Sequence, residues 1–244
     1  MAAPLLAVSP HFDDAALSVG ATIAAARTDV VVCTVFAGLP QPPLSEPAGE
    51  FHALCALGDE AVAVRRAEDR AAHALLGARV VHWDFLDAIY RRRGNGWLVE
   101  HLGSHLDAAT LFEPELTDEI AAALRELVRS LRPAEVWTCA AIGDHVDHRA
   151  VLAASRAACA AEAVPLYLWE DLPYAVGRPA PSIETALVSQ PADLAAKLDA
   201  IACYGSQLGM LFGETDWRTV LAEHARARRT AHGASELMWA AAAP

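Results

Sequence analysis

Short apolar runs alternate with longer helical patterns along most of the chain. Runs of strand length, rich in β-branched or other apolar residues, occur at residues 4–8, 30–36, 78–85, 135–140 and 166–169. Segments with helical composition and spacing lie between them, at residues 15–27, 60–76, 117–131 and 149–161. Continuous apolar strands are typical of sheets that are covered on both faces. The alternation therefore predicts an α/β fold with a parallel sheet between two helical layers.

Two long connections leave the predicted strands at the edge where the strands end. Residues 38–58 contain four prolines, and residues 86–97 combine acidic, aromatic and arginine side chains. Connections of such length are usually functional, so we expect both to form walls of a site. Nearer the C-terminus the pattern predicts a β-like segment at 185–188, helices at 192–204 and 216–228, and a short apolar end at 237–239.

A histidine and two carboxylates, His11, Asp13 and Asp14, follow the first predicted strand directly. In an open α/β sheet the turn between a strand and its helix lies at the carboxyl edge, where ligands bind. Aspartate is also common at helix N-termini, so the same turn could simply cap the helix that begins near Ala15.

A second cluster of the same kind favours a shared site over a helix cap. Gly143-Asp144-His145-Val146-Asp147-His148 follows the apolar strand at 135–140 and opens the next helical segment. Together the two clusters supply imidazole and carboxylate groups, and three such ligands with an open position are typical of a catalytic metal site. Cys139, next to the second cluster, is an alternative ligand.

The composition narrows the classes of function. A chain of 244 residues suits one domain over residues 1–244, and its formal net charge of −12 argues against a nucleic-acid partner. No apolar stretch reaches about 18 residues, so we expect no membrane span, and the N-terminus lacks the basic segment of a signal peptide. The five scattered cysteines indicate a reducing, cytoplasmic environment.

The two clusters match known motifs. Pro10-His11-Phe12-Asp13-Asp14, paired with His145-Val146-Asp147-His148, resembles the LmbE-like (PIG-L) family of metal-dependent N-deacetylases, whose motifs are Pro-His-x-Asp-Asp and His-x-Asp-His. Weaker similarities lie at Arg65-x-x-Glu68 with Leu76-Gly77, and at residues 87–91, 170–174 and 197–207. The resemblance implies a Rossmann-like three-layer sandwich with a mostly parallel sheet.

The resemblance also implies roles for single residues. The positions that match the family's Zn²⁺ ligands are His11, Asp14 and His148, with another divalent metal such as Fe²⁺ as an alternative. Asp13 matches the general base that takes a proton from the metal-bound water. His145 matches the residue that stabilises the oxyanion, as an imidazolium kept charged by a carboxylate such as Asp147.

Two positions depart from the family pattern, and both are small residues. Ala15 stands where the family usually has glutamate, and Gly143 stands where some members have a tyrosine that assists the intermediate. That assistance is either absent here or provided by another loop.

The expected activity is removal of an acyl group, most simply acetyl, from an N-acetylated amino sugar or glycoconjugate, a small-molecule partner. The alternatives are an amidase that acts on a larger natural-product amide, a non-catalytic carbohydrate-binding protein, and a non-haem iron oxygenase built on two histidines and one aspartate. The sequence gives no oligomeric state.

Three groups of side chains are candidates for substrate binding. The resemblance places Arg65 and Asp87 at hydroxyl-binding positions, and Trp97 or Trp83 could stack on a sugar ring or belong to ordinary packing. The run at 91–93 is either a solvated set of arginines or a clamp for an anionic part of the substrate.

Overall fold

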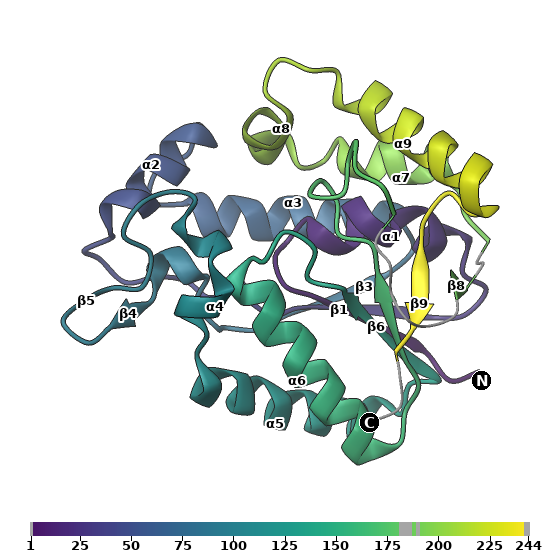
Figure 1. Ribbon diagram of the computed structural model, residues 1–244, viewed down its shortest axis with the longest axis horizontal. Coiled ribbons are helices and arrows are strands. Elements are labelled where there is room, and N and C mark those ends of the chain that lie inside the picture. Colours follow the sequence, from purple (N-terminus) through teal and green to yellow (C-terminus); the bar gives the residue numbers. More distant parts are fainter. Residues whose placement is uncertain (1, 181–186, 189–190, 242–244) are drawn as a thin grey trace.

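A seven-stranded sheet forms the centre of the computed structural model, which describes residues 2–180, 187–188 and 191–241 (Figure 1). The strand order is β3-β2-β1-β6-β7-β9-β8. The bounds are β1 (Leu5–Ser9), β2 (Val30–Thr34), β3 (Arg79–His82), β6 (Glu135–Cys139), β7 (Leu166–Trp169), β8 (Leu187–Val188) and β9 (Met238–Ala240). The pairs from β3 through β7 are parallel, whereas β9 runs antiparallel to both β7 and β8. The predicted α/β fold with a mostly parallel sheet is confirmed.

Helices cover both faces of this sheet, because alternate strand residues point to opposite sides. Leu6 and Val8 of β1 pack in a cluster with α5 (Pro114–Leu131) and α6 (Val146–Glu162). Ala7 packs on the other side with α1 (Asp14–Ala25), α3 (Ala61–Leu75) and α7 (Leu194–Ile201). In Figure 1 these two sets of helices lie below and above the sheet.

The connections hold more structure than the sequence pattern predicts. The proline-rich loop contains α2 (Glu46–Leu54), where the Ser45 side chain caps the helix by accepting from the Ala48 N–H. The second loop forms a short 3₁₀ turn, η1 (Ala88–Tyr90), and a hairpin of β4 (Arg92–Arg93) and β5 (Gly96–Trp97). After it come η2 (Ser104–Leu106) and α4 (Ala108–Leu111).

The C-terminal part differs in a similar way. The predicted helices become α7 and α9 (Trp217–His232), and α8 (Gly205–Phe212), which the pattern did not indicate, lies between them. The apolar end forms β9. Of the β-like segment predicted at 185–188, residues 187–188 form β8, and residues 185–186 lie outside the described residues.

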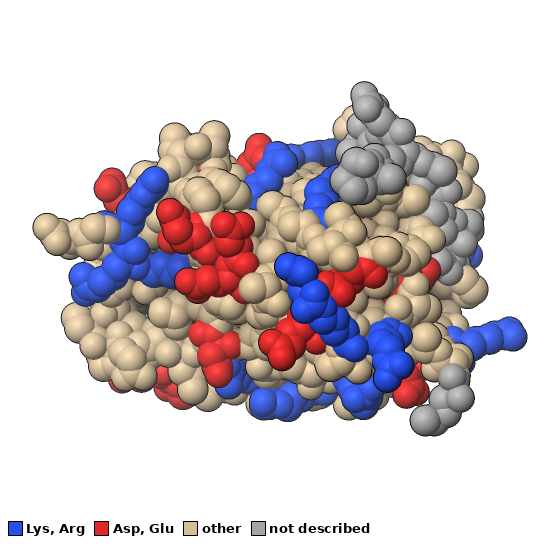
Figure 2. Space-filling model, turned by 90° about the horizontal axis from the view of Figure 1, so that it is seen from below, with Lys and Arg blue, Asp and Glu red and all other residues tan. Residues whose placement is uncertain are grey.

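The outer surface carries charges of both signs. Figure 2 shows the face that carries α5 and α6, on which acidic and basic side chains are interspersed. Within the described part of the chain, every helix is too short or too polar to cross a bilayer.

The buried carboxylate of Glu236 joins the C-terminal segment to α1 and to α7. Helical geometry is interrupted at Val19 (φ −130°), and the carboxylate of Glu236 accepts from the N–H groups of Ala21 and Thr22 just beyond the break. The ammonium of Lys197 lies 2.5 Å from the same carboxylate, and both side chains are buried. This contact holds the helix whose first turn carries Asp14.

We expect Glu236→Ala to lower the free energy of unfolding by about 3–5 kcal/mol, because it leaves a buried ammonium without a partner. Urea unfolding followed by circular dichroism measures the change. Glu162→Ala is the matched control, because among the described residues Glu162 pairs with Arg125 and Arg129 at the surface, and surface pairs contribute little. Equal losses in the two variants would contradict the importance of the buried pair.

Candidate metal centre and catalytic pocket

The turn between β1 and α1 is shaped by its own side chains. Ser9 Oγ donates to the His11 carbonyl (2.7 Å) and accepts from the Ala15 N–H (3.1 Å), while the His11 N–H donates to Asp14 Oδ2 (2.8 Å). Asp13 occupies the N-cap position but makes no capping hydrogen bond. The Asp13 side chain therefore does not cap the helix, and its carboxylate is available to the cavity that it lines.

The turn between β6 and α6 brings the second cluster to the same edge. Gly143 has a φ of +99°, a left-handed value that favours glycine. His145 is the N-cap residue of α6, and Asp147 and His148 lie in the first turn of the helix. Because β1 and β6 are adjacent and parallel, both turns lie at one edge of the sheet and face each other.

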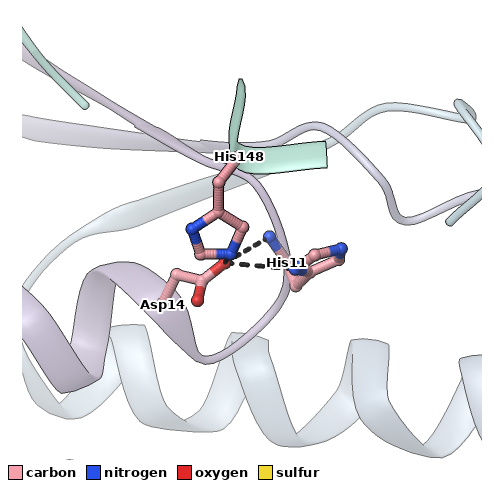
Figure 3. A group of neighbouring side chains, drawn as sticks. All are labelled: His11, Asp14 and His148. Carbon is pink, nitrogen blue, oxygen red and sulfur yellow. Dashed lines mark hydrogen bonds and ion pairs between the residues drawn. The ribbon is translucent and has the colours of Figure 1, made fainter. Parts of the chain in front are cut away.

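His11, Asp14 and His148 converge on one point (Figure 3). Asp14 Oδ2 lies 3.3 Å from His11 Nδ1 and 3.2 Å from His148 Nε2, and the three potential ligand atoms lie within 4.8 Å of one another. His148 Nε2 is fully buried and has no hydrogen-bond partner among the described residues. Two imidazole nitrogens and one carboxylate oxygen fit a zinc-type ion with an open coordination position.

The surrounding charges also favour a cation at this point. Burial alone would lower the pKa of His11, but the carboxylates of Asp87, Asp14 and Asp147 raise it to about 10. Burial would also lower the pKa of His148, but Asp14 and Asp171 hold this pKa well above its usual value. The cluster of carboxylates thus attracts positive charge, which a divalent ion would supply.

A carboxylate lies behind each of the two candidate histidine ligands. His11 Nε2 lies 3.0 Å from Asp147 Oδ2, and His148 Nδ1 lies 2.9 Å from Asp171 Oδ1. Such partners fix the ring orientation and increase the basicity of the ligand. Asp147 is completely buried behind His11, so its carboxylate contacts a candidate metal ligand.

A cavity of about 290 Å³ opens in front of the three ligands. Its polar lining comes from His11, Asp13, Asp14, Arg65, Asp87, His105, His145 and Tyr174. Its apolar lining comes from Phe51, Leu54, Ile89, Leu102, Pro173, Met210 and Leu211. The cavity therefore has charged groups beside the metal ligands and an otherwise apolar wall.

Asp13 and His145 are held in different electrostatic states. Burial, together with the nearby charge of Asp14, raises the pKa of Asp13 to about 6. Burial and the neighbouring His11 hold the pKa of His145 well below its usual value. His145 Nδ1 accepts from the Asp147 N–H (3.1 Å), so the neutral ring carries its proton on Nε2. The sequence led us to expect an imidazolium, whereas the structure gives a neutral N–H donor.

The structure brings two of the three predicted substrate-binding residues to the cavity. Arg65 is buried, with its guanidinium over the rings of Phe12 and Phe51 and its Nε donating to Gln207 Oε1 (3.0 Å). Asp87 Oδ2 lies 3.6 Å from His11 Nε2.

Trp97 is not placed with these residues. Its ring stacks on Arg92 and lines a separate surface hollow. Trp83 packs against Phe85. The prediction that a tryptophan stacks on a sugar ring therefore gains no support from the geometry.

Sequence reasoning did not assign a role to Tyr174, which fills the space in front of Gly143. A Cβ atom at residue 143 would lie 2.5 Å from Tyr174 Cδ1, so no side chain fits there without moving the ring. The ring also packs edge-on against His148, with 5.5 Å between ring centroids. Tyr174 thus occupies the space in front of Gly143 and lines the cavity from the loop after β7.

Two further side chains near the ligands were not identified as part of a site. Asp171 belongs to the weakly similar segment 170–174, which received no role in a site, and it lies two residues after the end of β7. His105 belongs to no motif found in the sequence. Cys139 donates its thiol proton to the His148 carbonyl (3.4 Å), and burial raises its pKa to about 11. A protonated thiol is a poor ligand, so this geometry does not favour Cys139 as one.

We expect Asp171→Asn to weaken zinc binding about 10–100-fold, because it removes the charged partner of His148. His148→Ala should abolish stable binding, since it removes a ligand. Titration against a chelator of known affinity measures both. Asp84→Asn, at an exposed site distant in sequence from either cluster, is the control, and wild-type affinity in Asp171→Asn would contradict the assigned contact.

Comparison with known proteins agrees with this geometry. Residues 6–159 match the family model described as PIG-L, GlcNAc-PI de-N-acetylase. No curated protein matched the chain. Among solved structures, the zinc-inhibited form of teicoplanin deacetylase Orf2 shares 36% identity and a TM-score of 0.85, covering 97% of both chains.

Two other solved structures are similar to this chain to different degrees. The A40926 pseudoaglycone deacetylase Dbv21 shares 33% identity and a TM-score of 0.77, covering 98% of this chain and 96% of the other. GalB, a 4-carboxy-2-hydroxymuconate hydratase from Pseudomonas putida, covers 99% of this chain and 97% of its own at only 19% identity and a TM-score of 0.59. That hydratase shows the fold alone, so the fold by itself does not define the reaction. With the family model matched over its two motifs and deacetylases among its similar structures, the chain belongs to the PIG-L (LmbE-like) family of metal-dependent N-deacetylases.

Proposed function

We propose that this protein is a zinc-dependent deacetylase that removes the N-acetyl group from an amino sugar attached to a larger natural-product scaffold of the glycopeptide type. The observation that carries the proposal is the convergence of His11, Asp14 and His148 beside an uncoordinated carboxylate, Asp13, in an apolar-walled cavity. The deacetylases that resemble this chain act, by their names, on teicoplanin and on the A40926 pseudoaglycone.

Each residue around the three proposed ligands has a separate role in amide hydrolysis. Zn²⁺ held by His11, Asp14 and His148 would polarise the acyl carbonyl and lower the pKa of a water molecule. Asp13 accepts the proton of the attacking water and passes it to the departing amine nitrogen. His145 donates its Nε2 proton in a hydrogen bond to the carbonyl oxygen as negative charge builds up there.

The cavity lining supports the proposed substrate class. Arg65 and Asp87 offer a donor and an acceptor for sugar hydroxyls beside the metal ligands. Leu54 of α2 and Met210 of α8 contribute to the apolar wall, and the Leu54 side chain is 58% exposed. An apolar wall that continues into an exposed leucine suits a bulky, partly aromatic scaffold better than a free monosaccharide.

The direct test uses zinc-loaded protein with an N-acetylglucosaminyl glycopeptide pseudoaglycone, and free N-acetylglucosamine for comparison. Released acetate and the free amine are measured by mass spectrometry. We expect hydrolysis of the conjugate at a much higher kcat/KM than the free sugar. Failure to release acetate from either compound would contradict the proposal, and release of a longer acyl group alone would favour an amidase.

We expect Asp13→Ala to retain zinc while its kcat falls about 10²–10⁴-fold, because a general base contributes rate without holding the metal. Metal analysis of the purified variant and steady-state kinetics on the same sample provide the two measurements. Normal turnover by this variant would show that another group takes the proton.

We expect Leu54→Ser to lower kcat/KM for the conjugate roughly tenfold, because a substrate that covers the exposed part of this leucine gains about 1.5 kcal/mol, the lower end of the value for a fully buried leucine. Its activity on small N-acetyl glycosides should remain unchanged, because they do not reach the rim. Leu75→Ser, also at an exposed leucine but absent from the cavity lining, is the matched control. An equal fall with both substrates would contradict a role in scaffold binding.

A further inference from the structure

Arg91 differs from the two arginines that follow it. Arg92 and Arg93 are exposed in the hairpin, whereas Arg91 is only 8% exposed. It therefore fits neither of the two sequence interpretations, because it is not solvated and is absent from the cavity lining. A buried guanidinium beside a metal site requires another explanation.

The contacts of Arg91 explain its burial. Its Nη2 lies 2.7 Å from Asp147 Oδ1 and 2.7 Å from Glu113 Oε2, and its Nε donates to the same Glu113 oxygen (2.8 Å). Its Nη1 donates to the Leu86 carbonyl (2.8 Å). The guanidinium also lies over the Phe36 ring, at 5.1 Å from the ring centroid.

These contacts lead to a metal ligand. Asp147 uses Oδ1 for Arg91 and Oδ2 for His11 Nε2, and the Ala88 N–H also donates to Oδ2 (3.0 Å). Phe36, beneath the guanidinium, packs against the His11 ring with 5.9 Å between centroids. Glu113, Arg91, Asp147 and His11 thus form one continuous chain, which starts at the N-cap residue of α5.

The other ligand histidine is supported differently. Asp171 holds His148 and accepts the Ile142 N–H (3.0 Å), and no lysine or arginine lies within ion-pair distance of it among the described residues. Asp147 therefore has a cationic partner that Asp171 lacks. A completely buried carboxylate with two acceptor oxygens needs compensation on both of them to stay in one orientation.

We propose that Arg91 is a positioning residue for the metal centre, which fixes the Asp147 carboxylate and thereby the orientation of His11, and that Glu113 anchors Arg91 in this role. The inference rests on the metal-dependent function proposed above. Arg91 is the cation within ion-pair distance of Asp147 Oδ1 (2.7 Å), so without it that buried oxygen would lose its charge compensation and the carboxylate would rotate away from His11. The expected consequence is weaker retention of the metal.

The test measures zinc affinity, which does not depend on any substrate. Arg91→Met, Arg91→Lys and Glu113→Gln are titrated with zinc against a competing chelator. We expect about 10–100-fold weaker binding for Arg91→Met, comparable to the loss of other partners of metal ligands. Arg91→Lys should recover part of that loss, and Glu113→Gln should show a smaller one. Arg92→Met is the matched control and should bind zinc like the wild type.

Asp147→Asn provides a second, independent criterion. If Arg91 acts through Asp147, then Arg91→Met should weaken zinc binding far less in the Asp147→Asn background than in the wild type. Wild-type affinity in Arg91→Met, or fully additive losses in the double variant, would overturn the proposal.

Two further results are decisive if folding or activity fails. If Arg91→Met does not fold, Glu113→Gln provides the test. The Glu113 side chain is partly exposed, so this substitution leaves the core intact. Wild-type zinc affinity in Glu113→Gln would overturn the proposed anchoring of Arg91. Tight, Arg91-dependent zinc binding in a protein that deacetylates no conjugate would support this inference while contradicting the proposed function.

Discussion

The pairing of β1 with β6 is the constraint on which the candidate metal centre depends. In the strand order the chain proceeds from β1 outwards to β2 and β3, and from β6 outwards in the opposite direction to β7. The helices that follow β1 and β6 accordingly pack on opposite faces of the sheet. The turns after these two strands therefore separate around a crevice, the topological switch point at which open α/β sheets bind ligands. Because Val8 pairs with Thr138, both strands end at the same level and their turns face each other.

The buried carboxylates in this crevice favour a positively charged ligand. Asp13, Asp14, Asp147 and Asp171 are all buried, and a buried carboxylate is costly unless it is paired and hydrogen-bonded. Asp147 has Arg91, and Asp14 has the two ligand histidines. Burial raises the pKa of both Asp171 and Asp13, whereas Asp14 and Asp147 have pKa values below their usual range because imidazole or guanidinium groups overcome the effect of burial. The imidazoles of His11 and His148 must be neutral to bind a metal ion. A divalent ion between them would then supply the positive charge that the neighbouring carboxylates need.

Local signals in the sequence predict the parts of this arrangement that depend on neighbouring residues. Each motif follows a strand and opens a helix, so the alternation of strands and helices places both at one edge without any knowledge of distant contacts. The environment of Arg91 could not be predicted in this way, because its partners come from residues 113 and 147. The neutral state of His145 was also missed, since it depends on the depth of burial and on the donor at Nδ1. The helices α2 and α8 were missed because proline in one case and a short, glycine-containing segment in the other weaken the periodic signal.

The origin of the cavity lining suggests how the reaction and the substrate preference are divided along the chain. The family model matches residues 6–159, which include His11, Asp14 and His148. Tyr174, Met210 and Leu211 belong to the lining but lie beyond that segment. The two parts are nevertheless joined, because Gln207 of α8 accepts from Arg65 and Ser206 donates to Glu68, both on α3. A change in α8 that displaces Gln207 would therefore remove the hydrogen bonds that hold Arg65, whereas His11 and His148 are held by different residues, Asp147 and Asp171.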